Sequence, residues 1–170
     1  MSSKNETRRA WSALLLGIGN EWASDDGVGP EVVRRVKVWW EGLERNATGE
    51  VGFVIMAQPD LALLDLLADC DRVIIVDAVR SGAPPGTLHR QAWEAGMLGD
   101  RGVERASSHG FGVRELLDMA RALGKLPPRV ELWGVEAAST APGRGLSPRV
   151  AEVVESTAQV LAEYLANLLP

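Results

Sequence analysis

The 170-residue chain has one cysteine, Cys70, and two histidines, His89 and His109. A lone thiol excludes a disulfide framework and a thiolate-rich metal site made by this chain, and the two histidines do not form a His-Glu-x-x-His zinc helix. No apolar run approaches the roughly 20 residues that span a bilayer. Basic residues do not predominate either, because the formal net charge is −5. We therefore expect neither a nucleic-acid nor a membrane partner.

Length and composition favour one globular domain. A hydrophobic content of 46% is too high for a disordered chain, and 170 residues suit a single core. Residues 1–10 are polar and are expected to form a disordered tail, which leaves residues 11–170 as the domain. An arginine pair at 8–9 resembles a twin-arginine leader, but the apolar stretch after it is too short. We expect a cytoplasmic protein.

Apolar runs and helical patterns alternate along the chain. Runs typical of buried strands occur at residues 13–16, 51–56, 73–76 and 130–135. Helical spacing of apolar residues occurs at residues 30–43, 60–69, 112–123 and from 148 onward. Residues 87–90 indicate an edge strand, and residues 91–106 are the least patterned. The alternation predicts a single-domain α/β fold, a twisted, mostly parallel sheet sandwiched between helices.

Ligand sites in such folds lie beyond the carboxyl ends of the strands. Three unusual places are expected there: the glycine–aspartate segment 17–29, Asp77 at the end of the strand 73–76, and His109 at the entrance to a helix. The segment 17–29 is a poor dinucleotide loop, since Trp22 stands where the third glycine is needed and two aspartates would repel phosphates. The chain also lacks a P-loop and a Gly-x-Ser-x-Gly elbow.

The acidic residues allow two interpretations. Asp25 and Asp26 suit helix capping, worth ~0.3–1 kcal/mol, while Asp77 and His109 suit ordinary strand-end and helix-start positions. Alternatively, two carboxylates converge within ~4 Å and repel by about 4 kcal/mol at an effective dielectric of ~20. A cation would remove that cost, and a neutral imidazole would add a ligand that nickel and zinc accept.

Several segments together resemble the hydrogenase maturation proteases. These are GIGNEWASDDGVGP at residues 17–30, VDA at 76–78, PGT at 85–87, SHG at 108–110 and GLSP at 145–148. The resemblance follows the family's order over nearly the whole chain. It implies a twisted sheet between helices and an endopeptidase that trims the C-terminal extension of the large-subunit precursor of nickel–iron hydrogenases.

The resemblance also implies roles for individual residues. The family's metal ligands fall on Asp26, Asp77 and His109, which we also take as the catalytic residues. The expected metal is nickel presented by the precursor, or another divalent metal in the isolated protein. Asp25 is a candidate for an additional participant, although capping suits it as well, and the general base stays open.

Two other functions fit parts of the pattern. A non-catalytic nickel-binding assembly chaperone could use the same three ligands, and a nucleotide-binding oxidoreductase could use the same α/β scaffold. The chain also departs from many relatives at residues 57–60 and 136–140, where they carry glycine-containing stretches. Together with residues 91–106, these departures leave open which hydrogenase is the client.

Four further residues are not expected to be catalytic or to bind metal. We expect His89 to be a surface strand residue and Cys70 to be a semi-buried filler. Trp39 and Trp40 lie about 100° apart around a helix axis, so one of them is expected to be exposed, either as rim packing or as a docking spot.

Overall fold

The computed structural model describes residues 10–42, 50–93, 104–105 and 112–169. Its elements are β1 (Ala13–Ile18), the 3-10 helix η1 (Ser24–Gly27), α1 (Val28–Glu41), β2 (Val51–Met56), α2 (Leu63–Ala68), β3 (Arg72–Arg80), β4 (Leu88–Ala92), β5 (Glu104–Arg105), α3 (Val113–Ala122), β6 (Arg129–Glu136) and α4 (Pro148–Leu168). The tail that the sequence predicts falls almost entirely on residues 1–9, outside the described part.

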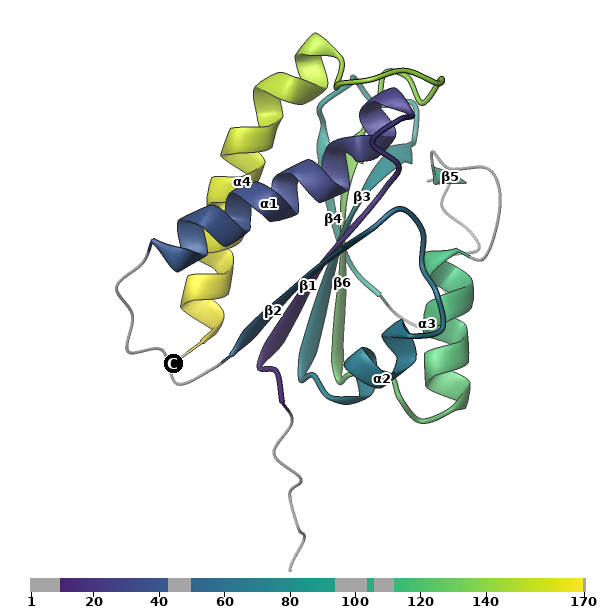
Figure 1. Ribbon diagram of the computed structural model, residues 1–170, viewed down its shortest axis with the longest axis vertical. Helices are drawn as coiled ribbons and strands as arrows, with labels where there is room; N and C mark the ends of the chain where they lie inside the picture. The colour runs from purple at the N-terminus through teal and green to yellow at the C-terminus, as the bar shows by residue number, and fades with distance from the viewer. Residues whose placement is uncertain (1–9, 43–49, 94–103, 106–111, 170) are drawn as a thin grey trace, which may run out of the picture.

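The sheet has the strand order β2-β1-β3-β6-β4, and β5 pairs with β3. β2, β1, β3 and β6 are mutually parallel, whereas β4 runs antiparallel at one edge. Helices α1 and α4 cover one face, and α2 and α3 cover the other (Figure 1). The predicted α/β sandwich, including the edge strand near residues 87–90, is confirmed.

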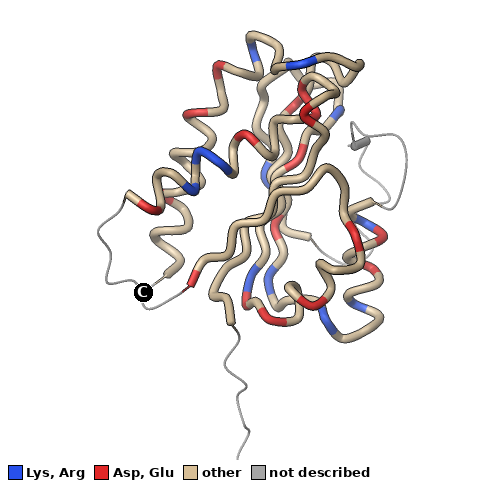
Figure 2. The backbone as a smooth tube through the Cα atoms, in the orientation of Figure 1, with Lys and Arg blue, Asp and Glu red and all other residues tan. Residues whose placement is uncertain are grey.

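Both faces of the central strands are buried, which explains their continuous apolar sequences. Leu15 and Ile74 pack beneath α1 and α4, while Leu14 and Ile75 pack beneath α2 and α3, because successive side chains of a strand point to opposite faces. Figure 2 shows β1 and β2 free of charged residues. In the described part of the chain, no helix is both long and apolar enough to cross a bilayer.

One predicted strand end was wrong. The sequence placed the end of the third strand at Asp77, but β3 continues to Arg80. The continuation is stabilised by pairing with β6 as far as Val79 and with β5 at Val79 and Arg80. Asp77 therefore lies inside the strand, opposite Gly134 of β6.

Candidate active site

Glycines allow the start of α1 to pack directly against the sheet. A Cβ on Gly29 would lie 2.4 Å from the carbonyl oxygens of both Ile18 and Val76, and a Cβ on Gly17 would lie 2.7 Å from the carbonyl oxygen of Gly29. No side chain fits these contacts. The close approach brings η1, which precedes α1, into contact with β3, the strand that carries Asp77.

Asp26 lies in η1 and is 4% exposed. Its Oδ2 accepts a hydrogen bond of 2.7 Å from the backbone N–H of Asn20, but its buried Oδ1 has no hydrogen-bond partner among the described residues. The turn depends on Gly19, whose φ is +149° and whose Cβ would lie 1.7 Å from the Asp26 carbonyl oxygen. The loop thus holds one carboxylate oxygen and leaves the other unsatisfied, which is costly for a buried charged group.

Asp77 supplies a second buried carboxylate, 8% exposed. Its Oδ1 accepts a 2.9 Å hydrogen bond from the backbone N–H of Ala78. Since η1 contacts β3, two carboxylates that are remote in sequence come from elements that touch each other.

Within the described residues no three His, Cys, Asp or Glu side chains form a metal-binding group. His109, the third ligand named from the sequence, lies outside those residues, so its place stays a prediction.

Neither aspartate caps α1, so the capping interpretation was wrong. The N-cap of α1 is Gly27, a residue that has no side chain with which to cap the helix. Asp25 is fully buried, and its carboxylate accepts four hydrogen bonds from the β6–α4 loop (residues 137–147). The donors are the backbone N–H groups of Ala138 (2.9 Å), Ser139 (3.0 Å) and Ser147 (2.6 Å), and the Ser147 hydroxyl (3.0 Å). Asp25 therefore has a structural role: its carboxylate holds the β6–α4 loop in place.

Further bonds join the same two loops. In the β1–α1 loop (residues 19–27), the N–H of Ser24 donates to the Gly143 carbonyl and the N–H of Gly143 donates to the Trp22 carbonyl, each at 2.9 Å. The Ser24 hydroxyl donates to the Ala141 carbonyl at 2.9 Å, and Ser24 has a positive φ of 52°. Sequence reasoning missed this contact, because nothing local to either segment indicates its partner.

A second acidic group lies where β3 ends, next to the candidate site. Glu136 is buried and accepts hydrogen bonds from the Ser81 hydroxyl and N–H (both 2.8 Å), from the Gly82 N–H (3.0 Å) and from His89 Nε2 (3.0 Å). Burial alone would raise the pKa of Glu136, but these hydrogen bonds lower it below its usual value. His89 is a residue of the edge strand, as predicted, and its partner is this carboxylate.

A polar network under α4 was also missed from the sequence. Buried Glu131 accepts hydrogen bonds from Arg72, Arg90 and Tyr164, and the Arg90 guanidinium lies over the rings of Tyr164 and Trp133. Burial raises the pKa of Glu131, but the hydrogen bonds and the charge of Arg90 outweigh it, so the pKa is lowered. The network joins β3, β4, β6 and α4, which is a structural role.

The expectation for Cys70 was wrong, and the expectation for the tryptophan pair is confirmed. Cys70 is fully buried rather than semi-buried, because it packs in the core beneath α2. Trp39 is 43% exposed whereas Trp40 packs against the core, so one tryptophan of the pair is exposed as predicted. The Trp39 indole N–H donates to Glu155 of α4 at 3.0 Å.

Comparison with known proteins now decides the family. Residues 58–164 match the family model described as hydrogenase maturation protease. The chain belongs to this family. It is 30% identical over 158 residues to the hydrogenase 2 maturation protease of Escherichia coli K12, covering 88% of each chain. It is also 29% identical over 155 residues to the hydrogenase expression/formation protein HupD of Thiocapsa roseopersicina, covering 91% of this chain and 67% of that one.

Solved structures of hydrogenase maturation proteases are similar to this chain as well. The hydrogenase maturating endopeptidase HybD of Escherichia coli is similar with a TM-score of 0.74 and 28% identity, over 92% of this chain and 94% of that one. The maturation protease HycI of Thermococcus kodakarensis shares the fold, with a TM-score of 0.69 and 22% identity, over 94% and 95%. The chain is a peptidase of hydrogenase maturation, and the chaperone and oxidoreductase interpretations are set aside.

Proposed function

We propose that this maturation protease removes the C-terminal extension from the nickel-loaded large-subunit precursor of a nickel–iron hydrogenase. In this proposal Asp26, Asp77 and His109 contact the nickel that the precursor carries, and the reaction takes place in the cytoplasm. The client's nickel is part of the substrate, so a precursor without nickel is not cut.

The unpartnered Oδ1 of Asp26 is the observation that carries the proposal. A buried acceptor without a partner costs about 1–3 kcal/mol, and more when the group is charged. The structure tolerates this cost where Asp77, a second buried carboxylate, lies on a contacting element. A cation bound by both would give the unpartnered oxygen of Asp26 its missing interaction, and nickel accepts carboxylate and imidazole ligands.

The chain's own groups orient these carboxylates for substrate. The Asn20 N–H fixes Asp26 Oδ2, and the Ala78 N–H fixes Asp77 Oδ1. In each side chain the backbone thus restrains one oxygen, so the carboxylate enters the complex with little freedom left to lose. The precursor's nickel can polarise a nearby carbonyl or acidify a water. A carboxylate not engaged by the metal could accept the proton of the attacking water.

The test mixes nickel-loaded precursor with the wild type and with Asp26→Asn, Asp77→Asn and His109→Ala variants, and follows the precursor's mass. We expect each substitution to slow the shortening at least 100-fold. Asp118→Asn, on the exposed side of α3, is the matched control and should cut like the wild type. Thermal unfolding serves as a folding check, because Asp26→Asn removes a buried unpaired charge and should not lower the unfolding temperature.

Three outcomes contradict the proposal. Unchanged trimming by the Asp26 and His109 variants would remove the metal-contact mechanism. Equal trimming of nickel-free and nickel-loaded precursor would remove nickel from recognition. A precursor that is bound but never shortened would contradict cleavage itself.

A further inference from the structure

Trp22 is a large aromatic side chain presented to solvent next to the candidate site. It is 61% exposed, although it lies only four residues before buried Asp26. Its backbone is held from both sides: its N–H donates to Asn20 Oδ1 at 3.0 Å, and its carbonyl accepts from the Gly143 N–H at 2.9 Å. An exposed indole on an ordered loop presents a contact surface that loses little conformational freedom on binding.

Arg144 lies over this indole. Its Cζ is 3.8 Å from the centroid of the Trp22 ring, a cation–π contact between the two loops that Asp25 joins. Within the described residues Arg144 forms no ion pair with a carboxylate. By contrast, Arg34 is paired with Glu21 and Arg149 with Glu152. The stacked pair thus presents a positive charge that forms no ion pair with any carboxylate in the part of the chain that the structure describes.

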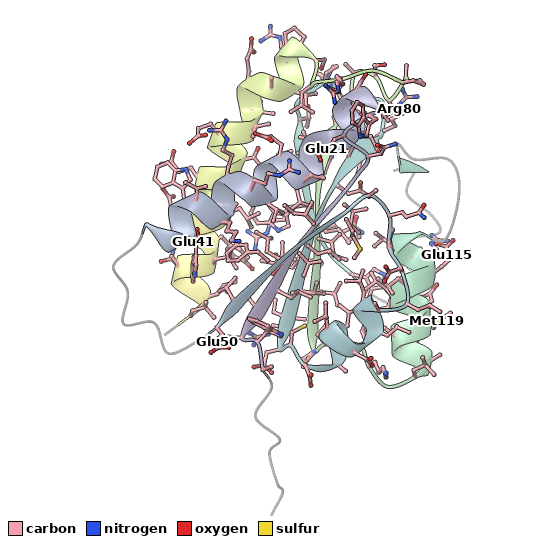
Figure 3. The ribbon with its side chains drawn as sticks, in the orientation of Figure 1. Glu21, Glu41, Glu50, Arg80, Glu115 and Met119 are labelled. Carbon is pink, nitrogen blue, oxygen red and sulfur yellow. The ribbon has the colours of Figure 1, made fainter. Side chains whose placement is uncertain are left out.

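A second arginine lies at the same end of the sheet. Arg80 is exposed at the end of β3, three residues after Asp77, and in the strand pair it lies opposite Glu104 of β5. Figure 3 shows Arg80 and Glu21, the neighbour of Trp22, at the same end of the molecule. Arg144 thus follows β6 and Arg80 ends β3, the two neighbouring parallel strands, in a chain of net charge −5.

A groove adjoins the stacked pair. It has a volume of about 350 Å³, and it lies between the β1–α1 loop, the first turns of α1 with Glu31 and Arg35, and the first turns of α4. Glu21 and Ser24 line it on one side, Gly145 follows Arg144 at its rim, and Leu146 and Val154 give it an apolar part. An extended peptide lying on Trp22 could therefore place an apolar side chain in the groove.

We propose that Trp22 and Arg144 form a docking platform for an acidic segment of the hydrogenase precursor. A carboxylate of that segment pairs with the Arg144 guanidinium, while the neighbouring peptide packs on the exposed indole. Trp22 and Asp26 belong to one loop, so docking on the platform places the precursor next to the candidate carboxylates. The inference rests on the proposed function for its partner.

The experiment measures cleavage kinetics with the nickel-loaded large-subunit precursor from the same organism, and in parallel the Kd of that precursor. Arg144→Glu replaces attraction by repulsion and should raise KM more than tenfold, Arg144→Gln three- to tenfold, and Trp22→Ala about fivefold, each with kcat within twofold of wild type. The Trp22 loop bonds through its backbone, so Trp22→Ala should still fold.

Two matched controls and a salt series separate docking from a structural role. Arg149→Glu, on the surface of α4, and Trp39→Ala, near the far end of α1, should leave KM unchanged. Raising the salt from 0.05 to 0.5 M should raise KM for the wild type and much less for Arg144→Gln, because salt screens exposed charge pairs.

Each remaining outcome is decisive. A KM for Arg144→Glu within twofold of wild type, or a fall in kcat alone, overturns the platform. A raised KM without a salt dependence overturns the acidic partner. If the wild type binds the precursor without shortening it, the proposed function fails, and the Kd values of the same variants still decide the platform.

Discussion

Replacing Gly29 by alanine sets two known effects against each other. Alanine is the better helix former, and in a helix interior the exchange contributes up to ~1 kcal/mol of stability. At Gly29, however, the new Cβ would lie 2.4 Å from two backbone oxygens, those of Ile18 in β1 and Val76 in β3. Backbone in the middle of a buried sheet cannot move away cheaply, so α1 must shift instead. Overpacking of this kind costs about 1–3 kcal/mol, occasionally more.

We therefore expect Gly29→Ala to lower the free energy of unfolding by about 2 kcal/mol, within the range for overpacking after the gain in helix propensity. For a chain of this size that corresponds to a fall of roughly 4–8 °C in Tm. Because the shift moves η1, which carries Asp26, cleavage of the precursor should fall as well. Urea and thermal unfolding followed by circular dichroism measure the first effect, and the mass of the precursor measures the second.

Gly42→Ala provides the matched control at the other end of α1. Gly42 has a φ of −81°, and an added Cβ would meet nothing closer than 3.5 Å, so this variant should be as stable as the wild type or slightly more stable. A Gly29→Ala protein that is as stable as Gly42→Ala and cleaves at the wild-type rate would refute the packing argument.

Four other substitutions test three buried acidic groups. Asp25→Asn should cost about 2–4 kcal/mol, since an amide presents N–H to N–H donors, whereas Ser147→Ala removes one of four bonds and should cost about 1 kcal/mol. Glu136→Gln should destabilise at pH 7. Because the folded-state pKa of Glu136 is lowered, the deficit should shrink as pH falls below the ordinary value of 4.5. Glu131→Gln should cost about 3 kcal/mol by leaving the largely covered Arg72 without its counter-charge.

Urea unfolding of these variants measures the losses in stability, and the expectation for each acidic group can be refuted by itself. Equal losses for the Asp25 and Ser147 variants would mean that the carboxylate does not hold the β6–α4 loop. A deficit in Glu136→Gln that is the same at pH 7 and pH 3 would contradict the lowered pKa. A loss below about 1 kcal/mol in Glu131→Gln would show that its arginines find water instead.

Local sequence was enough to predict most of the elements. The run 51–56 forms β2 with the predicted bounds, and Pro148 begins α4 as expected. Both follow from rules that act within a few residues: apolar continuity in a strand covered on both faces, and the fixed φ of proline in a first helical turn. The end of β3 was missed because Asp77 is a polar residue in a strand whose continuation depends on pairing with β6 and β5.

The sequence by itself determined the α/β alternation and the glycine loop, because these depend on periodicity and glycine sterics. Only the tertiary structure separated the two adjacent aspartates. Asp25 is held by residues more than 110 positions away, while one oxygen of Asp26 has no partner in the part of the chain that the structure describes. A hydrogen bond between remote segments leaves no pattern in either one, since its geometry exists only after the sheet and helices have packed.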